Sequence, residues 1–134
     1  IAANRWTTLS GGRKAGVMEA VMKGAAEKGG ITLGILPDAD RKSASPHVQI
    51  PVTTGMGSAR NNINVLSSDI VVVIGVGLGT LSEAALAIKA GKPVIFLDYT
   101  DHLKKLITDF ETDSTYWSDS VLEAIKIIKK QLLG

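Results

Sequence analysis

The sequence has 134 residues, of which 45% are hydrophobic and 4% aromatic, with a formal net charge of +2 and no cysteine. This length suits a single domain with a core of aliphatic side chains. The lack of cysteine excludes disulfides, thiolate zinc sites and a cysteine nucleophile, and it fits the reducing cytoplasm in which we expect the protein to reside. Basic residues do not cluster with aromatics and no segment has the length of a membrane span, so we expect neither nucleic acid nor a membrane as a partner.

Short strands and helices are predicted to alternate along the chain. Apolar residues at helical spacing after Gly16 predict a helix that Gly29 and Gly30 end. The apolar run VVVI at 71–74 is typical of a strand buried on both faces, and Pro51 suits an edge or the end of a strand. In chain order the predicted elements are strand 6–10, helix 16–28, strand 31–36, a short strand 48–52, helix 59–68, strand 69–74, helix 80–90, strand 93–98, helix 101–110 and helix 118–134, the last capped by Ser118 or Asp119.

This alternation is typical of an α/β fold. We expect one Rossmann-like domain over residues 1–134, with three layers in which an open parallel sheet has helices on both faces. The chain begins with IAANRWTTLSGG, which looks like the end of a helix running into a strand. We therefore expect that a preceding strand and helix of this domain lie outside the sequence. In open parallel sheets, ligands bind beyond the carboxyl ends of the strands.

Three glycine-containing turns, SGGRKAG, TGMGSAR and GVGLGT, follow predicted strands and precede predicted helices. The first backbone N–H groups of a helix have no partner inside the helix and carry positive partial charge, and glycine lets an anion approach them. Three such turns in one small domain indicate an anionic ligand, most simply a phosphate. The candidate ligand-binding residues are Ser10, Gly11, Gly12, Arg13, Gly57, Ser58, Arg60, Asn61, Gly75, Gly77, Gly79, Thr80 and Glu83.

Several of these side chains also have a purely structural interpretation. Arg60 could clamp an anion or lie on the surface, and Thr80 could donate to a phosphate or cap a helix. Glu83 could hydrogen-bond a ligand or act as a general base, although the helix dipole favours a carboxylate in a first helical turn in any case. His47 and His102 have no partner set for metal binding or nucleophilic catalysis, so we expect exposed structural roles for both.

The turns fit the standard nucleotide-binding motifs poorly. GGRKAGVM lacks the Lys-Ser/Thr ending of a P-loop, and Gly75, Gly77 and Gly79 are spaced G-x-G-x-G rather than G-x-G-x-x-G. Asp98 lies near the position of a ribose-binding acid, which keeps a dinucleotide as an alternative ligand.

The segments GGRKAGVMEAVMKGAAEKGGITLGILP and GSARNNINVLSSDIVVVIGVGLGTLSEAALAIKAGKPVIFL resemble the lysine decarboxylase-like superfamily. Its best-known enzymes are the cytokinin-activating phosphoribohydrolases of the Lonely guy type, which cleave nucleoside 5′-monophosphates at the N-glycosidic bond. Their motif is P-G-G-x-G-T-x-x-E, preceded by an arginine, and Arg60 and Glu83 match its arginine and glutamate. However, residues 75–77 are G-V-G in place of P-G-G, and Ser82 replaces the first acid of an acidic pair.

The pattern is closer to a sister group, the molybdenum cofactor carrier proteins. This resemblance implies a non-catalytic protein that binds, protects and transfers the molybdenum cofactor, a pterin dithiolene whose terminal phosphate would bind at the helix N-termini, with no metal ligand from the protein. It also implies a homotetramer, with molybdenum enzymes or cofactor-biosynthesis proteins as donors and acceptors. The alternative is a nucleoside 5′-monophosphate phosphoribohydrolase that uses Arg60 and Glu83, and a mononucleotide-sensing module is a third possibility.

Overall fold

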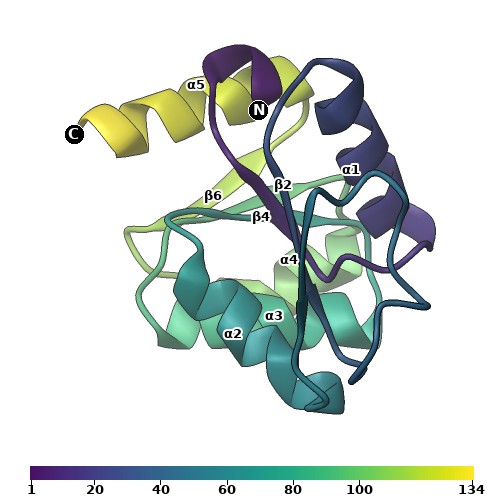
Figure 1. The fold of residues 1–134 in the computed structure, drawn as a ribbon. Coiled ribbons are helices and arrows are strands. Elements are labelled where there is room, and N and C mark those ends of the chain that lie inside the picture. The colour runs from purple at the N-terminus through teal and green to yellow at the C-terminus, as the bar shows by residue number, and fades with distance from the viewer. The chain divides into compact units, whose positions relative to one another are not determined.

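The computed structural model describes residues 1–134 and divides into two compact units, Ile1–Asn64 and Val65–Gly134. Each unit contains an open sheet of three parallel strands, and five α-helices flank the two sheets (Figure 1). This is the Rossmann-like α/β class that the alternating pattern predicts. None of the helices combines the length and the apolar character needed to cross a membrane.

The first unit holds a parallel sheet with the strand order β1-β2-β3. Its elements are η1 (Ala2–Asn4), β1 (Thr8–Ser10), α1 (Gly16–Glu27), β2 (Thr32–Leu36), β3 (Ile50–Thr53) and the short η2 (Gly57–Ala59). Helix α1 packs on β1 and β2 and buries Met22 completely. Pro51 lies in β3 at the edge of this sheet, as predicted, because a proline offers no N–H to a further strand.

Two backbones approach each other closely at the end of β1. A Cβ atom added to Gly12 would lie 2.8 Å from the Cα of Gly34 in β2, and Gly12 has a φ of 71°. Glycine alone fits this conformation and this spacing without strain. Packing within the unit therefore accounts for the glycine at this position.

The second unit holds another parallel sheet, with the strand order β4-β5-β6. Its elements are β4 (Val71–Ile74), α3 (Leu78–Lys89), β5 (Val94–Leu97), α4 (Asp101–Thr108), β6 (Thr115–Ser118) and α5 (Val121–Leu133), while α2 (Arg60–Ser67) includes residues of both units. Phe96 of β5 is fully buried in its core. Ala84 and Ala87 of α3 belong to the same core and are also fully buried, so these small residues let the helix pack closely.

The C-terminal part of the chain differs from its prediction in two places. The prediction leaves residues 111–117 as a connection and starts the last helix at residue 118. In the structure residues 115–118 instead form β6, which pairs with β5. Helix α5 is capped by Ser120 rather than by Ser118 or Asp119. Ser118 belongs to β6, and Ser120 Oγ accepts a hydrogen bond from the N–H of Glu123 at 3.1 Å.

Candidate functional site

The first turn lies between β1 and α1, and most of its backbone groups are paired inside the unit. The N–H of Gly12 donates to Ser10 Oγ at 3.0 Å, and the carbonyl of Gly12 accepts from the N–H of Ser45 at 2.8 Å. The N–H of Lys14 donates to the carbonyl of Ser43 at 2.9 Å. The loop between β2 and β3 therefore covers this turn, which leaves an anion fewer N–H groups than the sequence pattern predicts.

Arg60, the first residue of α2, lies beside this turn. Its Nη1 donates to the carbonyl of Ile35 in β2 at 3.2 Å, and a Cβ atom added to Gly11 would lie 1.7 Å from the same nitrogen. Gly11 is buried, while Arg13 is exposed. The guanidinium thus lies over Gly11 at the carboxyl end of β1 and β2, where the sequence predicts an anion site.

The second turn connects β3 to η2 and α2. The N–H of Gly57 donates to the carbonyl of Pro37 at 3.0 Å, which holds the turn against the end of β2. Ser58 is exposed within η2, and the half-buried Asn61 lies in the first turn of α2. The structure therefore brings the first and second turns to the same carboxyl edge of the sheet β1-β2-β3.

The third turn, in the second unit, joins β4 to α3. Gly75 has a φ of 74°, and its N–H donates to two carbonyls at the end of β5. Gly77 is the N-cap of α3 and offers no side-chain acceptor, so the helix begins at Leu78 and not at the predicted Thr80. The N–H groups of Leu78, Gly79 and Thr80 have no partner inside the helix. In this turn both the N-cap, Gly77, and the second helical residue, Gly79, are glycines.

The start of α3 also bears on the structural interpretations of two side chains. Thr80 is the third residue of the helix, so it is not the cap. Glu83 is half-buried in the second turn, so the favourable dipole energy of a first-turn carboxylate does not explain its position. Ser82, which replaces an acid of the hydrolase motif, donates its Oγ to the carbonyl of Gly79 at 2.8 Å.

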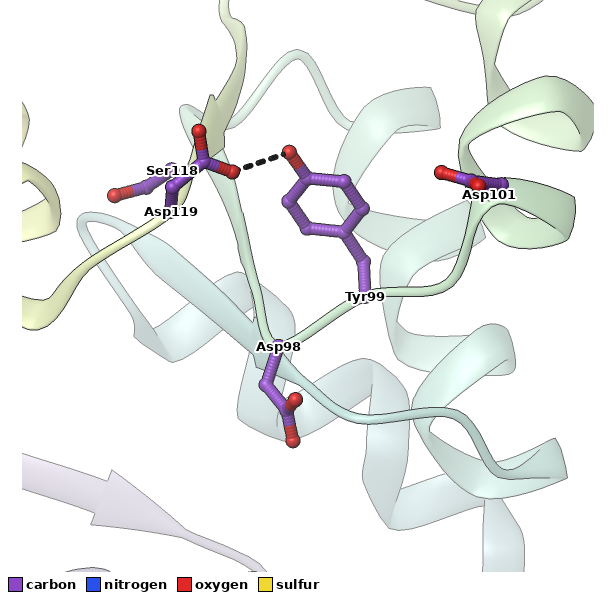
Figure 2. Close-up of a pocket in the computed structure, with 5 residues that line it drawn as sticks. All are labelled: Asp98, Tyr99, Asp101, Ser118 and Asp119. Atoms are coloured by element: carbon purple, nitrogen blue, oxygen red, sulfur yellow. Dashed lines mark hydrogen bonds between the residues drawn. The ribbon is translucent and has the colours of Figure 1, made fainter.

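A hollow that the sequence patterns do not reveal lies at the carboxyl ends of β5 and β6. It has a volume of about 310 Å³ and is lined by Asp98, Tyr99, Asp101, Ser118 and Asp119 (Figure 2). The hydroxyl of Tyr99 donates to Asp119 Oδ1 at 2.9 Å, and the side chain of Asp98 points away from this pair. Sequence reasoning identifies only Asp98 here, because Ser118 and Asp119 reach this edge through the unpredicted strand β6.

The chemistry of this hollow is acidic. The hydrogen bond to Asp119 raises the pKa of Tyr99 above the ordinary tyrosine value, and desolvation and the negative charges of Asp119, Glu123 and Asp101 act in the same direction. The Tyr99 ring packs edge-on against Trp117, with the ring centroids 4.7 Å apart. Carboxylates at such a surface repel a phosphate, so the hollow does not share the anion-binding chemistry of the glycine turns.

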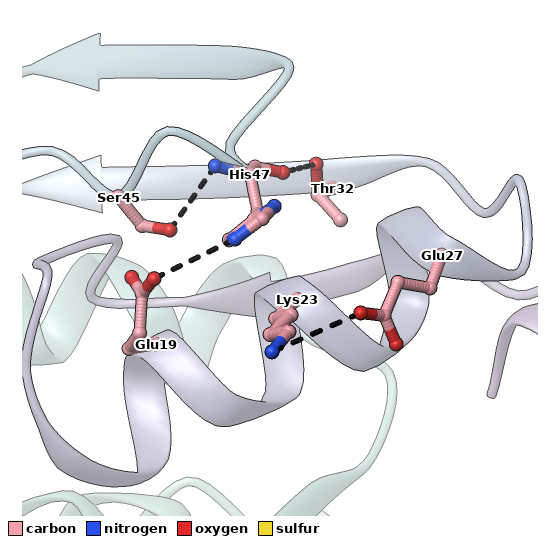
Figure 3. Close-up of polar contacts among 6 residues, drawn as sticks. All are labelled: Glu19, Lys23, Glu27, Thr32, Ser45 and His47. Carbon is pink, nitrogen blue, oxygen red and sulfur yellow. Dashed lines mark hydrogen bonds and ion pairs between the residues drawn. The ribbon is translucent and has the colours of Figure 1, made fainter.

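His47 is not the exposed residue that the sequence predicts. Its Nε2 lies 3.6 Å from Glu19 Oε1 in α1, and its side chain is 33% exposed. The backbone N–H of His47 donates to Ser45 Oγ at 3.2 Å, and its backbone carbonyl accepts from Thr32 Oγ1 at 2.6 Å (Figure 3). This partner was not predictable from the sequence, because Glu19 is distant from His47 in the chain. His102 is exposed in α4, as predicted.

Comparison with known proteins shows the family of this chain. The profile of the SLOG cluster4 family matches residues 1–125. This chain belongs to the SLOG cluster4 family. Because the SLOG cluster4 family is part of the lysine decarboxylase-like superfamily, the predicted superfamily is confirmed.

Two solved structures resemble this SLOG cluster4 chain over almost its whole length. The molybdenum cofactor binding protein from the phototrophic bacterium Rippkaea orientalis is 45% identical with a TM-score of 0.94, and the match covers 98% of this chain and 80% of that chain. The molybdenum cofactor carrier protein of Chlamydomonas reinhardtii is 44% identical with a TM-score of 0.93, over 99% of this chain and 81% of that chain. The predicted resemblance to the carrier group is confirmed, and the hydrolase alternative is not favoured.

The match to a relative found by sequence covers a smaller share of this chain than the two structural matches do. An uncharacterized protein of Archaeoglobus fulgidus is 44% identical over 95 residues, which are 71% of this chain and 62% of that protein. The match therefore spans less than two thirds of that relative.

Proposed function

We propose that this protein binds, protects and transfers the molybdenum cofactor as its cargo. The observation that carries the proposal is the similarity to a molybdenum cofactor binding protein and a molybdenum cofactor carrier protein at 44–45% identity over nearly the whole chain. In this cofactor the dithiolene of the pterin holds the metal, and the molecule ends in a phosphate. The protein therefore has to supply contacts for an anion and for a pterin rather than ligands for the metal.

The proposed phosphate site is the N-terminus of α3. The extended Gly77 caps the helix without a side chain, and a Cβ atom on Gly79 would meet nothing within 4 Å apart from its chain neighbours and the backbone of its own helix, so an anion has room to approach. The N–H groups of Leu78, Gly79 and Thr80 then donate to it, and the helix dipole favours its charge. Thr80 Oγ1 lies 3.8 Å from the Cβ position of Gly77 and adds a hydroxyl donor at the same place.

Each unit, taken by itself, offers further groups that suit a ligand of this chemistry. In the first unit, Arg60 is the proposed cationic contact, because a guanidinium forms paired, charge-assisted hydrogen bonds with anionic oxygens. In the first unit Asn61 suits pterin N–H and carbonyl groups, since an amide both donates and accepts. In the second unit Glu83 suits pterin N–H groups, since a carboxylate accepts.

The proposed partners follow from the role as a carrier. Molybdenum enzymes or cofactor-biosynthesis proteins would act as donors and acceptors of the cofactor. A homotetramer is the proposed assembly, and light scattering coupled to gel filtration measures its mass directly. A monomeric mass would contradict the assembly but not the binding of cofactor.

Retention of cofactor during gel filtration tests the central proposal. The purified protein is incubated without oxygen with molybdenum cofactor released from a molybdenum enzyme, and the protein fraction is then assayed for molybdenum and for pterin fluorescence. We expect both to co-elute with the protein. A protein fraction free of both would contradict the proposal, and release of free base from a nucleoside 5′-monophosphate would establish the hydrolase instead.

A carboxylate at residue 79 separates phosphate binding from folding. Gly79→Asp places a negative charge in the first turn of α3, where the helix dipole stabilises it but where it repels a phosphate. We expect cofactor retention to fall about tenfold or more while the urea midpoint stays the same or rises. Gly79→Ala adds a Cβ atom without a charge and should retain the cofactor. Full retention by Gly79→Asp would place the phosphate elsewhere.

A further inference from the structure

The guanidinium of Arg60 occupies the space that a side chain at residue 11 would need. A Cβ atom on Gly11 would lie 1.7 Å from Nη1 of Arg60, 2.6 Å from its Cζ and 2.7 Å from Sδ of Met18. The optimal separation of two carbon atoms that are not bonded to each other is about 3.5–4.0 Å. A side chain at residue 11 and Arg60 in its present place therefore exclude each other.

The backbone at Gly11 does not itself require glycine. Gly12 next to it has a φ of 71°, whereas Gly11 is not among the residues with positive φ. The three atoms nearest to its Cβ position all belong to the side chains of Arg60 and Met18, and both side chains are long and flexible. An added methyl group would thus be accommodated by moving these side chains rather than by unfolding the turn.

A second contact defines where the guanidinium lies when Gly11 leaves room for it. Nη1 of Arg60 donates to the carbonyl of Ile35 at 3.2 Å, near the end of β2. Arg60 begins α2, so its backbone is held by the helix while its tip reaches the carboxyl edge of the sheet. We infer that Gly11 is a positioning residue whose missing side chain lets Arg60 present its guanidinium at this edge. This inference rests on the proposed function, in which Arg60 is an anion contact.

A double-mutant cycle tests the inference. Gly11→Ala, Arg60→Ala and the double variant are compared with the wild type for the Kd of the molybdenum cofactor. We expect Gly11→Ala to raise the Kd about tenfold when Arg60 is present, because a hydrogen bond to a charged group is weakened. In the Arg60→Ala background the same change should alter the Kd less than about twofold. Equal losses in both backgrounds, or no loss in the first, would overturn the inference.

A measurement without cofactor keeps this test apart from the proposed function. The Nε–H resonance of Arg60 in a ¹⁵N NMR spectrum should shift in Gly11→Ala and stay in place in Gly24→Ala, where an added Cβ atom meets nothing within 4 Å. If the wild type retains no cofactor, the proposed function fails, while a shifted resonance still supports the positioning role. An unmoved resonance overturns that role. So does a Gly11→Ala protein that fails to fold, because the collision would then involve the backbone.

Discussion

Nε2 of His47 lies 3.6 Å from Oε1 of Glu19, and this contact joins the loop between β2 and β3 to the first turn of α1 (Figure 3). The Glu19 side chain is 26% exposed. The same helix carries a second pair, Lys23 and Glu27, whose charged atoms are 3.9 Å apart and whose side chains are 59% and 60% exposed. One helix therefore offers a shielded pair and a solvated pair for comparison.

The shielded pair should contribute more to stability than the solvated one. We expect Glu19→Gln to lower the free energy of unfolding by about 1 kcal/mol, measured by urea denaturation. Glu27→Gln should change it by less than about 0.5 kcal/mol, because water screens the exposed pair. Equal effects of the two substitutions would show that His47 does not hold the loop through this carboxylate.

Gly12→Ala should destabilise the first unit. Its Cβ atom would meet the backbone of Gly34, which cannot rotate away as a side chain can, and its φ of 71° disfavours alanine. We expect the free energy of unfolding to fall by about 1–3 kcal/mol. Gly24→Ala, inside α1, is the matched control and should raise it by about 0.5–1 kcal/mol. A neutral Gly12→Ala would mean that β1 and β2 separate easily at this point.

Tyr99 should lose its phenolic proton at higher pH than an ordinary tyrosine. Phenolate absorbance reports this pKa cleanly in a Tyr116→Phe background, because the chain has two tyrosines. Asp119→Asn removes both the charged acceptor and a nearby negative charge, so we expect the pKa of Tyr99 to fall toward its ordinary value. Asp109→Asn is the control, since that carboxylate does not act on Tyr99.

The same shift has a consequence for stability at alkaline pH. Because folding raises the pKa of Tyr99, its stabilisation is present below the ordinary tyrosine pKa and is lost as the pH rises through the raised value. The unfolding midpoint of the wild type should therefore decline at alkaline pH. The decline should be smaller in the Asp119→Asn variant, because its Tyr99 has a pKa closer to the ordinary value. Identical alkaline declines in both proteins would contradict the role of the Tyr99–Asp119 hydrogen bond.

Ser120→Ala should remove the N-cap of α5. Ser120 Oγ accepts from the N–H of Glu123, and the carboxylate of Glu123 accepts from the N–H of Asp119 at 3.0 Å, so the two side chains together satisfy the helix start. We expect a loss of about 1 kcal/mol in the free energy of unfolding. Ser120→Asp keeps an acceptor at this place and should restore most of it. If Ser120→Asp lost as much stability as Ser120→Ala, the hydrogen-bond acceptor at residue 120 would not be what stabilises the helix start.

The pattern of the sequence predicts those parts of the fold that depend on short-range physics. The apolar run at 71–74 needs burial wherever it lies, so β4 was predictable, and Pro51 restricts β3 to an edge by its missing N–H. Strand β6 was not predictable, because residues 115–118 acquire their extended form by pairing with β5. The N-cap of α5 was misplaced for the same reason.

The candidate site likewise has parts that the local sequence predicts and parts that depend on distant residues. The positions of the three glycine turns follow from local sequence, and the structure places each turn between a strand and a helix. What the glycines do depends on distant residues: Gly12 faces Gly34, Gly11 faces Arg60, and Gly77 caps α3. The acidic hollow was missed because its lining residues come from the ends of two strands, one of them unpredicted.

By itself, the sequence determined the α/β class, the order of most elements, the location of the glycine turns and the resemblance to the cofactor carrier group, because each of these is written in residues close together in the chain. Only the tertiary structure decided that the β2–β3 loop covers the first turn, that His47 has Glu19 as its partner and that Arg60 lies over Gly11. Each of these contacts joins segments that are far apart in sequence, and residues so separated meet only when strands pair and helices pack.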